Sequence, residues 1–376
     1  MPQLPYREFH LYHLLDAYSQ GTLPLDLTIN HYFRLHTSLG PKDRGFLAET
    51  IYCLIRWQRL IDYFAPSSSW ADRYQTFLTL DLMQLQQDSS IPLDVRVSCP
   101  SYLFERLIPT YGIEQAAELS LINNTPAPTT VRANALKITR DELIKRWQSM
   151  YPVSATLNAS TGITFHKRKN FFQLPEFKEG LFEVQDEGSQ LLADLVQPQE
   201  SDLVLDYCAG SGGKTLAFAP KMNQKGQIYL HDIRPRALQE ARIRLRRAGI
   251  QNSQIILPTS PQLNKLKKKM NWVLVDVPCS GTGTLRRNPD MKWKFDEALV
   301  TRLIGQQRMI FEKALSFLHP KGHIVYATCS VLREENQDQL EHFIKTYDLK
   351  VEGEPFQSLP TEGGMDGFFG VVLKRR

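Results

Sequence analysis

The chain has 376 residues, with 45 Lys and Arg against 40 Asp and Glu, and its formal net charge is +5. Hydrophobic residues make up 42% and charged residues 23% of the chain, a globular composition that excludes a largely disordered or collagen-like protein. No apolar run reaches the roughly 18–20 residues of a membrane span, and the N-terminal residues do not resemble a signal peptide.

The first 125 residues are expected to form a helical domain. Apolar residues recur at helical spacing over residues 46–64 and again over residues 102–122. Pro66 and Pro100 mark breaks between helices. These residues by themselves indicate a packed helical bundle and no chemistry.

A small α/β module is expected over residues 126–180, after a linker that contains two prolines. Residues 131–136 predict a short strand. Thr139 and Glu142 have the spacing of a capping box, which predicts a helix that runs through Trp147.

From residue 181 onwards, strand-like and helical segments alternate. Strands are expected over residues 203–205, 227–230, 272–277 and 323–327, and helices over residues 214–220, 235–247 and 297–318. This alternation predicts an α/β domain over residues 181–376, built on a parallel, doubly wound sheet.

A glycine-rich loop, residues 208–215, follows the first of these strands. Such a loop lets a ligand approach the backbone at the carboxyl end of a strand. Gly213, Lys214 and Thr215 match the end of a nucleotide-triphosphate loop, but Cys208 stands where that motif needs its first glycine. A nucleotide-triphosphate site is therefore disfavoured.

The next predicted strand is followed by an acid, Asp232. An acid at this place suits hydrogen bonds to ribose hydroxyls, and it equally suits a cap for the helix that starts near Pro235. Loop and acid together predict an adenosine-containing cofactor, without choosing between NAD and S-adenosylmethionine.

The chain has five cysteines, and two of them, Cys279 and Cys329, each follow the end of a predicted strand. The five have no CxxC spacing and are too few for a disulfide framework, so we expect reduced thiols, no metal site and a cytoplasmic protein. Core cysteines usually lie inside elements, whereas these two lie where α/β proteins place their chemistry. A thiolate nucleophile is favoured, and a redox pair stays open.

Four segments resemble motifs of the RNA 5-methylcytosine methyltransferase family of the Sun/Fmu or RsmB type. They are residues 206–215, residues 276–293 with Pro-Cys-Ser, residues 326–336 with Thr-Cys-Ser, and residues 365–369. The resemblance implies a Rossmann-like S-adenosylmethionine-dependent methyltransferase core over residues 181–376. It also implies an N-terminal all-helical NusB-like RNA-binding domain over residues 1–125, with the small α/β module of residues 126–180 between them.

The implied activity is methylation of carbon 5 of a cytidine in RNA, with small-subunit ribosomal RNA as the expected target and a covalent cysteine–cytosine intermediate. The resemblance assigns the nucleophile to Cys329. It assigns removal of the carbon-5 proton and release of the enzyme to Cys279, and contact with both cofactor and cytosine to Asp276. Covalent catalysis of this kind divides one difficult step into two easier ones.

The resemblance also implies where S-adenosylmethionine binds. The implied contacts are Cys208, Ala209, Gly210, Ser211, Gly212, Gly213, Lys214, Asp232, Thr259 and Asp276. The family usually has Ala-Pro in place of Gly210-Ser211, and an Asp in place of Thr259. We expect these departures to weaken cofactor binding without abolishing it.

RNA contacts are expected from the segment after Cys279, namely from Arg286, Arg287, Lys292 and Trp293. The basic residues of 242–247 suit contacts with phosphates, but a solvated helix face would show the same pattern. We expect a monomer with RNA as its partner, no membrane and no metal. The alternative is a non-catalytic RNA-binding ribosome assembly factor.

Overall fold

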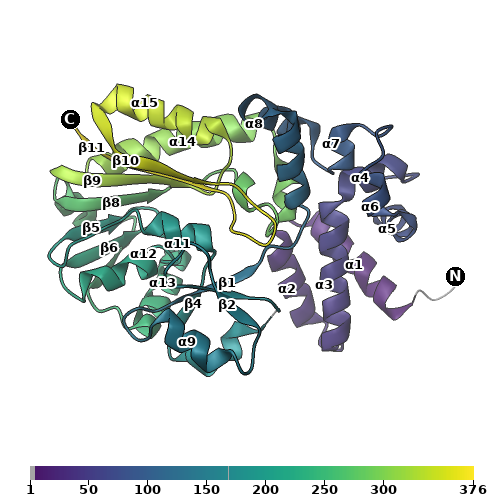
Figure 1. The fold of residues 1–376 in the computed structure, drawn as a ribbon, viewed down its shortest axis with the longest axis horizontal. Helices are drawn as coiled ribbons and strands as arrows, with labels where there is room; N and C mark the ends of the chain where they lie inside the picture. The colour runs from purple at the N-terminus through teal and green to yellow at the C-terminus, as the bar shows by residue number, and fades with distance from the viewer. Residues whose placement is uncertain (1–4, 168) are drawn as a thin grey trace. The chain divides into compact units, whose positions relative to one another are not determined.

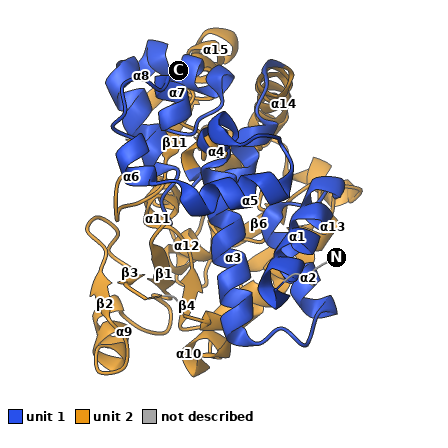
Figure 2. Ribbon diagram, turned by 90° about the vertical axis from the view of Figure 1, so that its right-hand side faces the viewer, with its two compact units in different colours: residues 1–126, 284–297 blue, residues 127–283, 298–376 orange. Residues whose placement is uncertain are grey.

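The computed structural model describes residues 5–167 and 169–376, so the first four residues of the expected helical domain and Arg168 of the small module lie outside the described residues. The chain forms two compact units (Figure 2). Unit 1 contains residues 1–126 and 284–297, and unit 2 contains residues 127–283 and 298–376. Residues 284–297, which we expected within the catalytic domain, thus belong to the unit of the N-terminal helices.

Unit 1 is helical. Its helices are α1 (Tyr6–Gln20), α2 (Leu25–Leu35), α3 (Pro41–Arg56), α4 (Gln58–Phe64), α5 (Trp70–Thr79), α6 (Leu82–Leu85), α7 (Leu93–Arg96) and α8 (Ser101–Ile122). The apolar run of residues 46–64 is divided at Trp57 between α3 and α4, and α8 is kinked at Gly112, whose φ is +77°. Leu47, Ile51 and Leu54 lie on one face of α3 and are fully buried in the core of the unit.

Unit 2 contains a small antiparallel sheet in the order β2-β3-β1-β4. Its elements are β1 (Thr129–Ala133), α9 (Arg140–Trp147), β2 (Val153–Ala155), β3 (Gly162–Phe165), α10 (Pro175–Lys178) and β4 (Phe182–Val184). The capping box of Thr139 and Glu142 is confirmed. The first strand ends three residues earlier than predicted, because the Asn134 side chain accepts from the Leu136 N–H and begins a turn.

The large sheet of unit 2 has the order β10-β11-β9-β8-β5-β6-β7 (Figure 1). Its strands are β5 (Leu203–Asp206), β6 (Gln227–His231), β7 (Ser253–Ile256), β8 (Met270–Asp276), β9 (Leu318–Thr328), β10 (Leu349–Ser358) and β11 (Phe368–Arg375). The first five of these are parallel, and four of them, all except β7, were predicted as strands of a parallel sheet. In contrast, β10 and β11 form an antiparallel hairpin at one edge. The described chain has no helix between β10 and β11 that could return it for a parallel pairing.

Helices cover both faces of the large sheet, which is the Rossmann-like arrangement that we expected (Figure 1). These helices are α11 (Glu187–Ala193), α12 (Thr215–Phe218), α13 (Pro235–Ala248), α14 (Glu297–Leu315) and α15 (Gln337–Tyr347). The first three pack on one face and the last two on the other, in two separate apolar clusters. The strands of the sheet centre are buried on both sides, and for this reason β8 is a nearly continuous apolar run.

Candidate active site

The glycine-rich loop leaves the sheet at its topological switch point. β5 lies between β6 and β8, so the chain continues from β5 towards one edge of the sheet and from β8 towards the other edge. In open α/β sheets, ligands bind in the crevice at this point. Gly210 and Gly212 have φ values of +53° and +79°, a left-handed conformation that favours glycine. A Cβ at Gly212 would also lie only 3.3 Å from the Ala241 Cβ, so the loop is held close to α13.

Asp232, at the end of β6, is hydrogen-bonded to this loop. Its Oδ2 accepts from the Gly210 N–H at 2.8 Å, and its Oδ1 accepts from the Arg234 N–H at 2.8 Å and from Arg234 Nε at 3.0 Å. Burial by itself raises the pKa of Asp232, but the hydrogen bonds from Arg234 and Gly210 outweigh burial and lower the pKa. The carboxylate is therefore ionised and fixed beside the loop, whether or not it also binds a ribose.

Lys214 and Asp276 connect the end of the loop to the end of β8. Lys214 Nζ donates to Asp276 Oδ2, and the side chains are 13% and 31% exposed. Burial lowers the pKa of Lys214, but the charge and hydrogen bond of Asp276 outweigh it and raise the pKa. Nearby, Asp206 accepts from Thr215 Oγ1 at 2.7 Å, and burial raises the pKa of Asp206 to about 7.

The two cysteines singled out by the sequence lie next to each other. Cys279 follows β8, Cys329 follows β9, and their Sγ atoms are 3.3 Å apart. Both residues are half-buried, so their thiols are sealed neither in the core nor fully in solvent. The Cys329 N–H also donates to Cys279 Sγ at 3.3 Å.

The surroundings of the two thiols distinguish their protonation states. The hydrogen bond with Cys279 lowers the pKa of Cys329 against the effect of burial, and Lys214 lowers it further. The same hydrogen bond, together with burial, raises the pKa of Cys279. The pKa of Cys329 is therefore shifted towards the thiolate form and that of Cys279 towards the thiol form.

A buried polar network ties the two cysteine loops together. Glu335 is fully buried and accepts from the Ser280 N–H at 2.9 Å, from Ser280 Oγ and from Gln307 Nε2 at 2.9 Å. Ser280 Oγ in turn lies 3.2 Å from Ser330 Oγ, in the loop of Cys329. The network was missed at the sequence level, although Glu335 lies within the resembling segment of residues 326–336.

Other residues of the predicted cofactor site have structural contacts of their own. The Ala209 N–H donates to the His231 carbonyl at 2.9 Å, and the Gly213 carbonyl accepts from Arg132 Nη1 at 3.2 Å. Burial and neighbouring carboxylates raise the pKa of Cys208, which keeps this thiol protonated. Thr259 lies exposed in the turn after β7.

The segment predicted to bind RNA lies in unit 1, and most of its side chains are not exposed. Lys292 is 3% exposed, and its Nζ donates to the Arg56 carbonyl at 2.6 Å, the Ser98 carbonyl at 2.7 Å and Asn124 Oδ1 at 2.7 Å. Trp293 Nε1 donates to the Ile55 carbonyl at 2.8 Å. The Lys292 ammonium group thus already has three acceptors within unit 1, and its contact with RNA stays a prediction.

The two arginines of this segment differ in exposure. The Arg286 side chain is 1% exposed, and its carbonyl accepts from Arg56 Nη2 at 2.9 Å. Its contact with RNA stays a prediction. Arg287 is half-buried, and its contact with RNA stays a prediction.

The four arginines of residues 242–247 in α13 divide into two pairs. Arg244 and Arg247 both pair with Glu183 of β4, whereas Arg242 and Arg246 are exposed. Only the exposed pair keeps the predicted suitability for phosphates.

Among residues 5–167 and 169–376, no group of three or more His, Cys, Asp or Glu side chains is arranged to hold a metal ion. No helix in the same described ranges is long and apolar enough to cross a membrane.

Comparison with known proteins agrees with this geometry. Residues 193–373 match the family model of the 16S rRNA methyltransferase RsmB/F, and residues 99–171 match the RsmF/B-like ferredoxin-like domain. The chain is similar to the ribosomal RNA small subunit methyltransferase B of Vibrio vulnificus, with 32% identity over 98% of this chain and 83% of that one. It is also similar to the probable ribosomal RNA small subunit methyltransferase B of Synechocystis sp., with 27% identity over 93% of this chain and 95% of that one.

Solved structures share the fold. The crystal structure of PH0851 superposes with a TM-score of 0.81 at 20% identity and covers 99% of both chains. A methyltransferase homologue from Pyrococcus horikoshii has a TM-score of 0.64 at 26% identity and covers 76% of this chain and 98% of its own. Together with the sequence relatives, these matches confirm the family resemblance and the Rossmann-like fold. The chain belongs to the family of S-adenosylmethionine-dependent ribosomal RNA small subunit methyltransferases of the RsmB/F type.

Proposed function

We propose that this protein methylates carbon 5 of a cytidine in small-subunit ribosomal RNA through a covalent bond to Cys329. The observation that carries the proposal is the pair of half-buried thiols, 3.3 Å apart at the carboxyl ends of β8 and β9, beside the ion pair of Lys214 and Asp276. Two thiols with opposite pKa shifts at one site supply a nucleophile and a proton-transfer group. A methyltransferase that acts on an oxygen or an exocyclic nitrogen needs no such pair.

The chemical steps follow from these side chains. The Cys329 thiolate adds to carbon 6 of cytosine, and the electron pair of the 5,6 double bond becomes available at carbon 5. S-adenosylmethionine, when bound, supplies the electrophilic methyl group that carbon 5 attacks. Once Cys329 is bonded to carbon 6, the interaction with Cys329 that raises the pKa of Cys279 is lost, and the Cys279 thiol releases its proton to solvent. The Cys279 thiolate then takes the proton from carbon 5, the 5,6 double bond re-forms, and Cys329 leaves as a thiolate.

Asp276 acts on the ring during the addition step. It lies at the end of β8, three residues before Cys279, and is 31% exposed on its side chain. As the thiolate adds, a ring nitrogen takes up a proton from solvent, and the Asp276 carboxylate stabilises the adduct by accepting a hydrogen bond from this protonated nitrogen. Stabilisation of developing charge by a fixed group is one of the largest contributions to enzyme rates.

The cofactor is proposed to bind along residues 208–214. The residues fit it, because Gly210 and Gly212 leave the loop free of side chains and Asp232 is held ionised beside it. We propose that Asp232 contacts the ribose and that Thr259 lies near the adenine. We further propose that the protein works as a monomer in the cytoplasm, where its thiols stay reduced.

The decisive experiment is bisulfite sequencing of ribosomal RNA from cells with and without the gene. The proposal predicts that one 5-methylcytosine in small-subunit RNA is lost without the gene and is restored by the wild-type protein but not by Cys329→Ala. An unchanged methylation pattern would contradict it. If the protein then bound RNA and no S-adenosylmethionine, it would be a non-catalytic assembly factor.

A further inference from the structure

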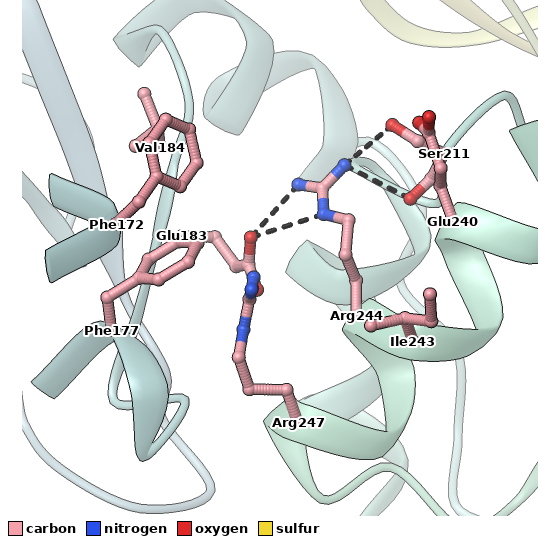
Figure 3. Close-up of a pocket in the computed structure, with 9 residues that line it drawn as sticks. All are labelled: Phe172, Phe177, Glu183, Val184, Ser211, Glu240, Ile243, Arg244 and Arg247. Atoms are coloured by element: carbon pink, nitrogen blue, oxygen red, sulfur yellow. Dashed lines mark hydrogen bonds and ion pairs between the residues drawn. The ribbon is translucent and has the colours of Figure 1, made fainter. Parts of the chain in front are cut away.

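Arg244 of α13 reaches the middle of the cofactor loop. Its Nη1 donates to Ser211 Oγ at 2.6 Å and to the Ser211 carbonyl at 3.0 Å. Figure 3 shows this side chain extended between Ser211 on one side and Glu183 on the other. The three residues line a surface cavity of about 390 Å³, together with Ile243 and Phe177 among others.

Glu183 holds Arg244 in this orientation. Its carboxylate is 5% exposed and accepts from Arg244 Nε at 3.2 Å and Nη2 at 3.1 Å. Because a guanidinium presents its donors in a rigid plane, fixing Nε and Nη2 on Glu183 also fixes the direction of Nη1. The small sheet is thereby linked through α13 to the glycine-rich loop.

The loop needs such a link. Gly210 and Gly212 flank Ser211, and glycine loses more conformational freedom on ordering than any other residue. A loop that is already ordered binds its ligand with a smaller entropic cost. A charge-assisted hydrogen bond to the residue between the two glycines supplies that order.

We propose that Arg244 is a positioning residue for S-adenosylmethionine, because it braces the cofactor loop through Ser211 while it is itself held by Glu183. The proposal rests on the proposed placement of the cofactor along residues 208–214. It assigns to Arg244 no contact with the cofactor or with RNA. It also gives a physical reason why a Gly210-Ser211 loop is compatible with an ordered site.

Arg247 provides a matched control. It also pairs with Glu183 and also lies on α13, but it packs over the Phe177 ring at 3.8 Å instead of contacting Ser211. Arg247→Met therefore removes one arginine from Glu183 without removing the brace. Arg244→Met removes an arginine from Glu183 and the brace together.

The test measures the Kd of S-adenosylmethionine by calorimetry and the Tm for each full-length variant. Loss of a charge-assisted hydrogen bond predicts a Kd about 10-fold higher for Arg244→Met, and less than about 2-fold higher for Arg247→Met, with similar losses of Tm. Ser211→Ala is expected to have a smaller effect, because the Ser211 carbonyl remains as an acceptor. Adding Ser211→Ala to Arg244→Met should not raise the Kd of S-adenosylmethionine any further.

The outcomes separate this proposal from the one on which it rests. Equal Kd values for Arg244→Met and Arg247→Met would overturn the brace. Strictly additive effects of Arg244→Met and Ser211→Ala would overturn it as well. Asp232→Ala tests the cofactor site itself. If this variant leaves the Kd of S-adenosylmethionine unchanged, the placement of the cofactor along residues 208–214 is wrong, and the proposed role of Arg244 is wrong with it.

Discussion

Two lysines of this protein are withdrawn from solvent, one in each unit, and their surroundings shift their pKa values in opposite directions. Lys214 pairs with a carboxylate, Asp276, which raises its pKa despite burial. Lys292 donates to two carbonyls and one amide oxygen, and burial lowers its pKa to about 7. Neutral oxygens satisfy the hydrogen bonds of an ammonium group but do not compensate its charge.

The difference indicates separate roles for the two regions. The region around Lys214 keeps a partly exposed carboxylate and two half-buried thiols, so charge and reactivity are maintained where a substrate can reach them. The region around Lys292 has its donors and acceptors matched within unit 1, which is the pattern of a structural anchor. The following predictions test this division, from the largest expected effect to the smallest.

Asp276→Asn should reduce methyl transfer most strongly, by about 100-fold in kcat, because an amide lacks the negative charge that stabilises the protonated ring nitrogen of the adduct. Asp290→Asn is the matched control, since Asp290 is a buried carboxylate that pairs with Lys294 in unit 1. It should change kcat by less than about 3-fold. Single-turnover assays with labelled S-adenosylmethionine measure the rate of methyl transfer for both variants. Equal losses of this rate would contradict the separate roles of the two regions.

Glu335→Gln should reduce activity by an intermediate amount. The amide places a donor where Ser280 and Gln307 also donate, so one cysteine loop shifts against the other. A displacement of about 1 Å between reacting groups lowers rates on the order of 100-fold at most, and we expect about 10-fold. The rate of adduct formation should fall while the Kd of S-adenosylmethionine stays constant; a changed Kd with an unchanged rate would show that the network serves the cofactor instead.

Lys292→Met should lower stability and leave the chemistry intact. It leaves the Arg56 and Ser98 carbonyls and the Asn124 amide oxygen without their donor, at a cost of about 2 kcal/mol in the free energy of unfolding. The kcat of the folded variant should stay within about 3-fold of wild type. Denaturant unfolding measures the loss of stability, and activity assays measure kcat. A large loss of kcat without loss of stability would place Lys292 in the catalytic machinery.

The pH dependence of stability gives the smallest and most specific signal. The folded pKa of Lys292, about 7, is depressed from an ordinary lysine value near 10.4. Between these values the unfolded chain binds more protons, so the stability of the wild type rises with pH across this window. The difference in unfolding free energy between wild type and Lys292→Met should therefore grow from pH 6.5 to pH 9. A difference that shrinks over this range would show that Lys292 is stabilised as an ammonium ion.

Local pattern was sufficient to predict much of the fold. The parallel strands β5, β6, β8 and β9 follow from apolar runs, and α9 follows from its capping box. The edge hairpin of β10 and β11 was not predicted, because antiparallel pairing depends on how the chain returns and not on periodicity. Both cysteines were expected at the carboxyl ends of strands in one sheet, but the structure is what shows that β8 and β9 are neighbours and that the two Sγ atoms lie 3.3 Å apart.

Contacts between distant residues could not be predicted in the same way. Lys292 binds acceptors 168 to 236 positions earlier in the chain, so the sequence shows its charge but not these contacts. Arg244 presents the same case on a smaller scale, because its partners lie on β4 and in the cofactor loop. A basic side chain in a sequence reports a charge, and only the fold shows whether that charge is already paired.

The central claim is that the two neighbouring cysteines divide nucleophile and proton transfer between them. The most direct measurement is a denaturing gel of purified protein incubated with small-subunit ribosomal RNA and S-adenosylmethionine. With Cys279→Ala the account predicts a stable covalent protein–RNA band, because the methylated adduct forms and is not released. With Cys329→Ala it predicts no band. A band that forms with Cys329→Ala and is absent with Cys279→Ala would contradict the assignment and exchange the two roles.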